Sequence, residues 1–213
     1  LNVYNERLLR LLAETQIPKV FLDTSSLVAP DELNGDLLLM ESRTSVRRIT
    51  CHLLEQGRTL PGFIGDISYA QSNRERYEGF CQALADAGKK VDSSLCLTTP
   101  LGIDTYREEI DTFLSSLSRM PDAFVCASDY VACILMQLLE KRGLRVPEDV
   151  AVSGFDNNTE DLLAEHLTTV QVFNEELGAR LALQILYRIK YPNTPHEITY
   201  LSTNVLYRDS TGD

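Results

Sequence analysis

The sequence predicts an α/β fold built on parallel sheets. Short apolar runs of strand length alternate along the chain with longer amphipathic stretches, and this alternation is typical of a doubly wound sheet covered by helices. Residues 150–155 are apolar on both alternating sets of side chains, as in a strand buried on both faces of a parallel sheet. Polar residues follow several of the apolar runs, at the sheet edge where such folds bind ligands.

The first half of the chain contains three helix patterns and three strand patterns. Each helix pattern has apolar residues three and four positions apart, and each strand pattern is a short apolar run. Ser72 and Glu75 have the spacing of a capping box, which predicts that one helix begins at Ser72. In order, we expect a helix over 5–15, a strand over 20–22, a polar loop over 24–42, a helix ending at Gly57, a strand over 61–66, a helix over 72–88 and a strand over 95–97.

The second half continues this alternation. Ser128 and Asp129 supply an N-cap and a first-turn carboxylate for a helix that Gly143 ends, and Pro147 prevents its continuation. In order, we expect a helix over 103–117, a strand over 123–127, a helix over 128–143, a strand over 150–155, an extended segment over 167–172, a helix over 175–189 and an extended segment over 198–206.

Four polar residues stand at the ends of two predicted strands: Ser128, Asp129, Asp156 and Asn157. One interpretation is that they recognise a small polar molecule beyond the carboxyl ends of the strands. The alternative is that they only cap a helix and form a turn, because Ser, Asp and Asn are preferred at both kinds of position.

The composition limits the classes of partner. The net charge of −11 over 213 residues repels phosphate backbones, so we expect no nucleic-acid binding through a broad basic face of this chain. No apolar run approaches the length of about 20 residues that a membrane-spanning helix needs, and no membrane partner is expected. The five cysteines form no CxxC pair and the three histidines have no metal-ligand spacing. We therefore expect reduced thiols, a cytoplasmic location and neither metal nor cofactor.

The chain also lacks the motifs that would indicate an enzyme. Neither GxGxxG nor GxxxxGK[ST] is present, and GFIGD at 62–66 lacks the glycine spacing of a dinucleotide site. No serine lies in a GxSxG elbow. Catalysis would rest on analogy with other α/β folds alone, and we expect a binding domain.

Three longer motifs and the chain's last residues resemble the LacI/GalR family of bacterial transcription regulators. They are SNRERYEGFCQAL at 72–84, DAFVCASDYVACILMQLLEKRGLRVPEDVAVSGFDN at 122–157, LTTVQVFNEELGARLALQIL at 167–186 and LYRDST at 206–211. The resemblance extends from residue 17 to the C-terminus, and the VPEDVAVSGFD and LTTV segments occur together at the family's spacing.

The resemblance implies a type I periplasmic-binding-protein-like fold, with two doubly wound parallel-sheet subdomains joined by three crossovers. It assigns residues 1–62 and 173–192 to an incomplete N-terminal subdomain, and residues 63–172 and 193–213 to the C-terminal one. The family's DNA-binding headpiece is expected outside this chain, because the resemblance covers only the part of the family that follows the headpiece. A homodimer is also implied.

The resemblance further implies a ligand site between the subdomains. Arg76 matches the arginine that binds ligand hydroxyls, Asp156 the carboxylate opposite it, and Asp23 a position that often faces the same cleft. A carboxylate and a planar guanidinium suit the paired hydroxyls of a sugar. Ser128 replaces the family's usual asparagine, which leaves the ligand's identity open. The expected ligand-binding residues are Arg76, Asp156, Asp23, Ser128, Asp129 and Phe173.

Aromatic residues near the strand ends could stack on a sugar ring. The candidates are Tyr69, Tyr130, Phe155 and Phe173, and core packing is the expected role of Phe155. Arg76 has an alternative as well, an ion pair with Glu75 or Glu78 on an exposed helix face. The implied function is a small-molecule sensor in a repressor of carbohydrate-utilisation genes; the alternative is a periplasmic sugar-binding protein of a transporter.

Overall fold

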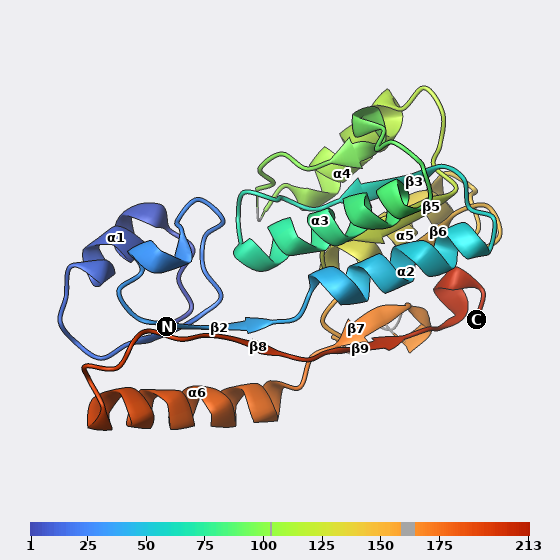
Figure 1. Cartoon of the computed structure of the whole chain (residues 1–213). Coiled ribbons are helices and arrows are strands. Elements are labelled where there is room, and N and C mark those ends of the chain that lie inside the picture. The colour runs from blue at the N-terminus through green and yellow to red at the C-terminus, as the bar shows by residue number, and fades with distance from the viewer. Residues whose placement is uncertain (103, 159–164) are drawn as a thin grey trace.

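The structure is a computed structural model that describes residues 1–102, 104–158 and 165–213. Two α/β units lie side by side, and the chain termini lie at opposite ends of the molecule (Figure 1). Each unit has its own parallel sheet. The predicted arrangement of two parallel-sheet α/β units is confirmed.

The first unit contains a three-stranded parallel sheet with the order β1-β2-β8. Its elements are α1 (Glu6–Ala13), β1 (Val20–Leu22), a 3-10 turn (Pro30–Glu32), β2 (Asp36–Met40), α6 (Asn174–Lys190) and β8 (Ile198–Leu201). The prediction of a polar loop over residues 24–42 is wrong, because β2 is the central strand of this sheet. β2 begins with a charged residue, Asp36, which interrupts the apolar pattern expected of a buried strand. Asp36 is nevertheless buried, in an ion pair with Arg188 of α6.

The second unit contains a four-stranded parallel sheet with the order β4-β3-β5-β6. Its strands are β3 (Pro61–Ile64), β4 (Cys96–Leu97), β5 (Ala123–Cys126) and β6 (Ala151–Ser153). Its helices are α2 (Arg43–Glu55), α3 (Gln71–Asp86), α4 (Tyr106–Ser116) and α5 (Asp129–Lys141), with 3-10 turns at Ser93–Leu95 and Asp209–Thr211. Residue 103, which the predicted helix over 103–117 included, lies outside the described residues.

Helices cover both faces of this second sheet. Ala123 and Val125 of β5 belong to a core cluster that includes side chains of α2 and α3. The alternate residues, Phe124 and Cys126, belong to another cluster that includes side chains of α4 and α5. Successive side chains of a strand point to opposite faces, so the sheet is doubly wound, as its apolar strands predict.

Three connections join the two units, and the predicted number of crossovers is confirmed. They lie at residues 41–42 between β2 and α2, at 172–173 between β7 (Thr169–Gln171) and α6, and at 202–203 between β8 and β9 (Asn204–Leu206). β7 and β9 form a two-stranded antiparallel ribbon that continues from the second unit toward the junction (Figure 1).

The predicted subdomain boundaries differ from this arrangement at two elements. Helix α2, expected in the N-terminal subdomain, packs against α3 of the second unit. Strand β8, expected in the C-terminal subdomain, pairs in parallel with β2, with Leu37 opposite Ile198. Both placements depend on contacts between distant parts of the chain.

The ends of the helices agree with the sequence in most places. The Ser128 side chain accepts from the Val131 amide at 3.3 Å, so its predicted role as an N-cap is confirmed. Gly57, Gly88 and Gly143 follow helices with φ of 88°, 68° and 73°, a conformation that glycine adopts without strain. The capping box at Ser72 is wrong: α3 begins one residue earlier, with Ala70 as its N-cap.

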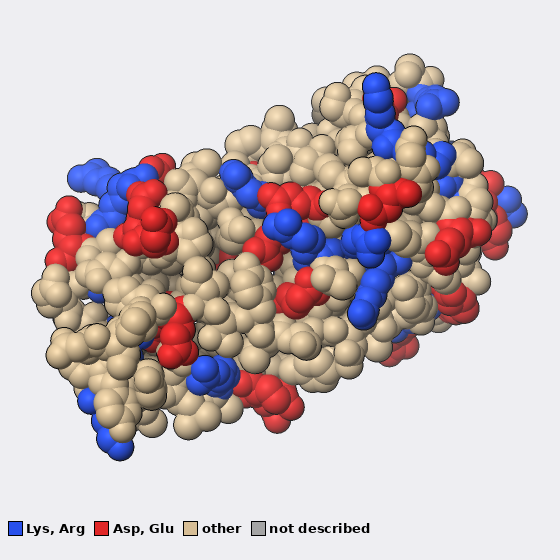
Figure 2. All heavy atoms as spheres, viewed as in Figure 1, with Lys and Arg blue, Asp and Glu red and all other residues tan. Residues whose placement is uncertain are grey.

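Charged side chains of both signs are mixed on the face drawn in Figure 2. Exposed side chains of opposite charge also form ion pairs, such as Arg47 with Asp86, 2.5 Å apart. Within the described ranges, no helix combines the length and the apolar character needed to cross a membrane. The same residues contain no group of three or more His, Cys, Asp or Glu side chains placed to hold a metal ion.

Candidate functional site

The candidate site lies at the carboxyl ends of the second sheet's strands, beside the junction with the first unit. β3 is followed by the loop that leads into α3, β5 by Ser128 and Asp129, and β6 by Asp156. Because the strands are parallel, these segments meet at one edge of the sheet, the edge at which open α/β sheets bind ligands.

Arg76 projects from α3 into this edge and is buried, with 4% of its surface exposed. Its guanidinium lies over the Phe155 ring, with Cζ 3.7 Å from the ring centroid. Its Nη2 lies 3.5 Å from Oδ1 of Asp156, and its Nη1 donates to the Ala127 carbonyl oxygen. The structure therefore brings Arg76 and Asp156 together. The alternative of an exposed pair with Glu75 or Glu78 is wrong.

One nitrogen of the Arg76 guanidinium forms no hydrogen bond with the described residues. Nε of Arg76 is buried and has no hydrogen-bond partner among the described residues. A buried donor without an acceptor is unfavourable. Phe155, fully buried as expected, lies under the guanidinium, a favourable contact because a cation is attracted to the face of an aromatic ring.

Asp156 presents its carboxylate outward from a strained turn. Its side chain is 43% exposed, and its backbone has a φ of 112°, which is unusual for a residue with a Cβ. The turn is held in place by β7, because the Asp156 amide donates to the Val170 carbonyl at 3.1 Å. The Asn157 side chain likewise donates to Oε1 of Gln171 at 2.6 Å. Such strain at a fixed turn is common at binding sites.

Asp129 stabilises the turn through two hydrogen bonds. Its side chain is 2% exposed. Its Oδ1 accepts from the Thr169 hydroxyl at 2.6 Å and its Oδ2 accepts from the Asn158 amide at 2.8 Å. Burial raises the pKa of Asp129 to about 6, against the effect of these two hydrogen bonds. The observed contacts of Ser128 and Asp129 are those of capping and turn formation.

Asp23 joins the two units. It follows β1 of the first unit with a φ of 59° and is 2% exposed. Its Oδ2 accepts from the Ser72 hydroxyl at 2.6 Å, and its Oδ1 accepts from the Ser72 amide at 3.3 Å. A carboxylate from another segment thus replaces the predicted capping box at the start of α3, because it satisfies an amide of the first helical turn.

Neighbouring contacts hold the same junction closed. The Gln71 amide donates to the Thr24 carbonyl at 2.8 Å. The Ser26 hydroxyl lies 3.0 Å from each of the carbonyl oxygens of Ile67 and Ser68. The loop after β1 therefore contacts both the loop between β3 and α3 and the first residue of α3.

Phe173 stands at the crossover into α6 and is 39% exposed. It is two residues beyond Gln171, which forms a β-bridge with Asp156. Two further residues bridge the units and were not expected from the sequence. The Tyr200 hydroxyl of β8 donates to Oε1 of Glu75 in α3 at 2.7 Å, and burial raises the pKa of Glu75. Their separation of 125 residues leaves no sequence signal.

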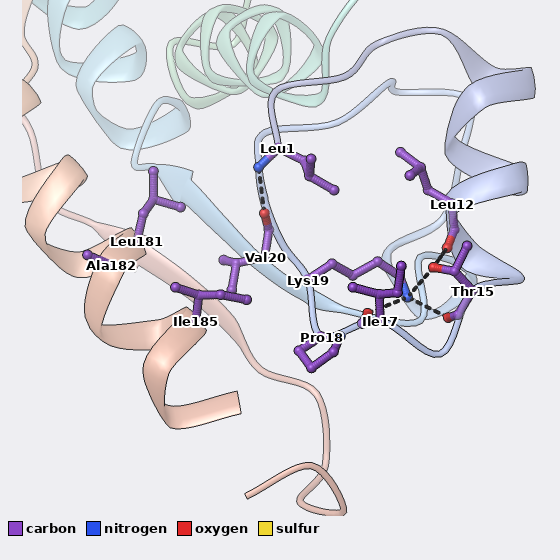
Figure 3. A pocket seen from close by; sticks show the side chains of 10 residues that line it. All are labelled: Leu1, Leu12, Thr15, Ile17, Pro18, Lys19, Val20, Leu181, Ala182 and Ile185. Atoms are coloured by element: carbon purple, nitrogen blue, oxygen red, sulfur yellow. Dashed lines mark hydrogen bonds between the residues drawn. The ribbon is translucent and has the colours of Figure 1, made fainter. Parts of the chain in front are cut away.

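A second hollow lies in the first unit, between α1, β1 and α6 (Figure 3). Its volume is about 550 Å³, and its lining is mainly apolar, with Leu1, Leu12, Ile17, Val20, Leu181 and Ile185 among the side chains. The Lys19 ammonium donates to the Thr15 carbonyl at 2.9 Å. No acidic side chain or guanidinium lines this hollow, so it does not match the recognition of a polar ligand.

Residues 50–211 match the family described as periplasmic binding protein-like domain. The chain is 29% identical over 209 residues to the HTH-type transcriptional repressor PurR of Aliivibrio fischeri (strain MJ11), a match that covers 97% of this chain and 61% of the relative. It is 31% identical over 170 residues to the HTH-type transcriptional regulator DegA of Bacillus subtilis (strain 168), with 79% and 48% covered. The chain thus spans less than two thirds of these relatives.

Solved structures give the same result. A putative transcriptional regulator of the LacI family from Sanguibacter keddieii DSM 10542 superposes with a TM-score of 0.77 at 27% identity, covering 92% of this chain and 72% of that one. The transcriptional regulator CelR in complex with cellobiose superposes with a TM-score of 0.78 at 28% identity, covering 90% and 58%. The chain belongs to the periplasmic-binding-protein-like domain family and corresponds to the effector-binding domain of LacI-type transcriptional regulators.

Proposed function

We propose that this chain is the ligand-sensing domain of a bacterial transcriptional regulator of the LacI/GalR type, a repressor of carbohydrate-utilisation genes. The domain binds a sugar or a related small polar effector and catalyses no reaction. The observation that carries the proposal is the pair of Arg76 and Asp156, 3.5 Å apart beside the junction of the two units. CelR, one of the structural neighbours, is described in complex with cellobiose.

The chemistry of the pair suits a polyol. The Asp156 carboxylate has exposed oxygen atoms that can accept hydrogen bonds from two neighbouring hydroxyls. The Arg76 guanidinium holds a fixed planar set of donors, and its stacking on Phe155 prevents rotation. Bonds to charged groups are worth about 1.5–3 kcal/mol each. Phe173, exposed on the same side of the junction, offers an apolar ring to the ligand.

The effector acts by changing how the two units are held. A ligand that contacts both units stabilises the closed arrangement that Asp23 and Ser72 already maintain, and it shifts the population toward that arrangement. Coupling to DNA requires a separate headpiece in the full-length protein, because the net charge of −11 makes this chain a poor partner for a phosphate backbone. We place the protein in the cytoplasm, as a homodimer.

The first test is a thermal-shift panel on the full-length protein with monosaccharides, disaccharides, sugar phosphates, polyols and nucleobases. A ligand that binds only the folded state raises the melting temperature. We expect a sugar to raise it, and we expect the shift to be lost in both Arg76→Ala and Asp156→Asn. The control is Asp86→Asn, which removes an exposed Arg–Asp pair elsewhere on the surface.

The outcomes separate the parts of the proposal. A sugar that shifts the wild type and Asp86→Asn but neither site variant supports the site and the ligand class. A shift that is equal in all four proteins would move the site elsewhere. For the regulatory part, the affinity of the full-length protein for operator DNA is measured with and without the sugar, and an unchanged affinity would contradict it.

A further inference from the structure

Four tyrosines form a continuous row along the same edge of the second sheet. The row consists of Tyr4, Tyr69, Tyr106 and Tyr130. The rings of Tyr4 and Tyr69 are 4.5 Å apart between centroids. Those of Tyr106 and Tyr130 are 5.7 Å apart and meet edge to face, with an interplanar angle of 84°. Tyr69 follows β3, which lies between the strands that Tyr106 and Tyr130 follow, so the two pairs are neighbours.

Sheet topology brings the row together. Tyr106 follows β4, Tyr69 follows β3 and Tyr130 follows β5, and these strands are adjacent in the order β4-β3-β5-β6. Asp156 follows β6, the next strand. The row therefore continues from the Arg76–Asp156 pair across the remaining strands. Three strand spacings of about 4.8 Å separate β4 from β6, a span of about 14 Å, which is wider than one six-membered ring.

The row is also connected to the Arg76–Asp156 pair from the first unit. The Tyr4 hydroxyl lies 3.5 Å from Oδ2 of Asp23. Burial and the charge of Asp23 raise the pKa of Tyr4, while the charge of Arg76 lowers it. The same Asp23 carboxylate accepts from Ser72 at the start of α3, the helix that carries Arg76. A ligand bound beside Arg76 would lie next to the row.

A hydrogen-bonded turn that contains Asp66 and Ser68 fixes the backbone position of Tyr69. Oδ1 of the buried Asp66 accepts from the Ser68 amide at 2.8 Å, from the Ser68 hydroxyl at 2.6 Å and from the Tyr69 amide at 3.2 Å. The Asn73 side chain also donates to the Asp66 carbonyl at 2.9 Å. These bonds fix the backbone of the turn, while 49% of the Tyr69 surface stays exposed.

Exposure distinguishes the row from an ordinary core cluster. Tyr130 is 59% exposed, although it is the second residue of α5 and its neighbours Asp129 and Val131 are buried. Aromatic rings at a wet surface combine an apolar face with a hydroxyl that bonds to water or ligand. The C–H face of a sugar ring and its hydroxyls match both properties of a tyrosine.

We propose that the tyrosine row is a second sugar subsite, which binds the outer ring of a disaccharide whose inner ring lies at Arg76 and Asp156. The proposal rests on the proposed sugar-sensing function and specifies the size of its effector. Tyr69 and Tyr130 contribute their exposed rings, and Asp66 is a positioning residue that holds the turn of Tyr69. The width of the row and its continuity with the Arg76–Asp156 pair favour two linked rings over one.

The test compares calorimetric titrations of the full-length protein with glucose, with cellobiose and maltose, and with adenine and guanine. The variants are Tyr69→Ala, Tyr130→Ala and Tyr130→Phe. The matched control is Tyr191→Ala, which removes a tyrosine that is 44% exposed at the far end of α6. We expect each alanine variant to bind the disaccharide about three- to tenfold more weakly. Glucose affinity stays within about twofold, and Tyr130→Phe retains most of the disaccharide affinity.

Each other result has a distinct meaning. Equal losses for glucose and the disaccharide, or no loss in either alanine variant, would refute the second subsite while leaving the Arg76–Asp156 site intact. Binding of a nucleobase in place of every sugar would refute the sugar assignment of both sites. If the wild-type protein binds none of these compounds, the proposed function fails together with the subsite.

Discussion

The carboxylate of Asp23, at the end of β1, accepts hydrogen bonds from both the hydroxyl and the backbone amide of Ser72, at the start of α3. This relationship crosses the junction between the two units. It therefore serves two purposes at once, as the N-terminal cap of a helix and as a contact that keeps the units together. Under the proposed function, effector binding at this junction acts on a contact that the protein already makes.

Replacing Asp23 with alanine should weaken both the N-terminal cap of α3 and the contact between the two units. Asp23→Ala leaves the Ser72 amide and hydroxyl without their acceptor, and we expect a loss of about 1–2 kcal/mol in the free energy of unfolding. Urea denaturation of the full-length protein measures the loss. A double-mutant cycle with Ser72→Ala supplies the control. Strictly additive effects of the two substitutions would contradict a direct interaction.

The raised pKa of Asp129 makes stability depend on pH. Its pKa of about 6 lies above the value of about 3.9 for an aspartate in an unfolded chain. The contribution of its protonated form is fully present below about pH 4 and is lost as the pH rises through about 6. Relative to wild type, Asp129→Asn should therefore gain about 2–3 kcal/mol in unfolding free energy between pH 4 and pH 7.

The asparagine variant is a suitable comparison because its amide keeps the local bonds. Its oxygen can accept from the Asn158 amide, and its nitrogen can donate to the Thr169 hydroxyl. Denaturant titrations of both proteins at several pH values give the difference directly. A difference that does not change between pH 4 and pH 7 would show that Asp129 titrates normally.

The ion pair of Asp36 and Arg188 fixes α6 to the first sheet. Both side chains are almost completely buried, and two guanidinium nitrogens, Nε and Nη2, reach the carboxylate at 3.0 and 2.5 Å. Burial raises the pKa of Asp36, but the hydrogen bonds from Arg188, Gln184 and the Glu197 amide hold it below its ordinary value. The stability that this pairing contributes is present above about pH 4 and is lost as the pH falls through the lowered pKa.

Arg188→Met should lower the unfolding free energy by about 3–5 kcal/mol, because it leaves the Asp36 carboxylate buried without its partner. The double variant Asp36→Leu with Arg188→Met should recover most of that loss. Chemical denaturation of the wild type and the variants is the measurement. If the double variant is as unstable as Arg188→Met, the unpaired charge is not the cause.

The local patterns of the sequence predicted most elements of the second unit, because those elements carry regular apolar periodicity. The first unit was less predictable. β2 opens with Asp36, and contacts with distant residues, among them Arg188, 152 residues away, make that residue compatible with a buried strand. β8 alternates between exposed and half-buried residues, and its position in the first sheet follows from pairing with β2.

The residues of the candidate site were also predictable only in part. The resemblance of the motifs placed Arg76 and Asp156 opposite each other, and the structure has them in contact. The bridging roles of Tyr200 and Tyr4 had no sequence signal, because each depends on a partner in the other unit, Glu75 for Tyr200 and Tyr69 for Tyr4. The capping box at Ser72 was a plausible local pattern. A carboxylate from a distant segment displaced it, and local spacing contains no information about such a competitor.

The most direct test of the central claim is a calorimetric titration of the full-length protein with the best sugar from the panel, in wild type, Asp156→Asn and the control Asp86→Asn. Asp156 is the exposed half of the pair, so its substitution changes the site with little effect on the core. We expect Asp156→Asn to bind at least about tenfold more weakly and Asp86→Asn to bind like wild type. Equal affinities in all three proteins would contradict a ligand site at Arg76 and Asp156.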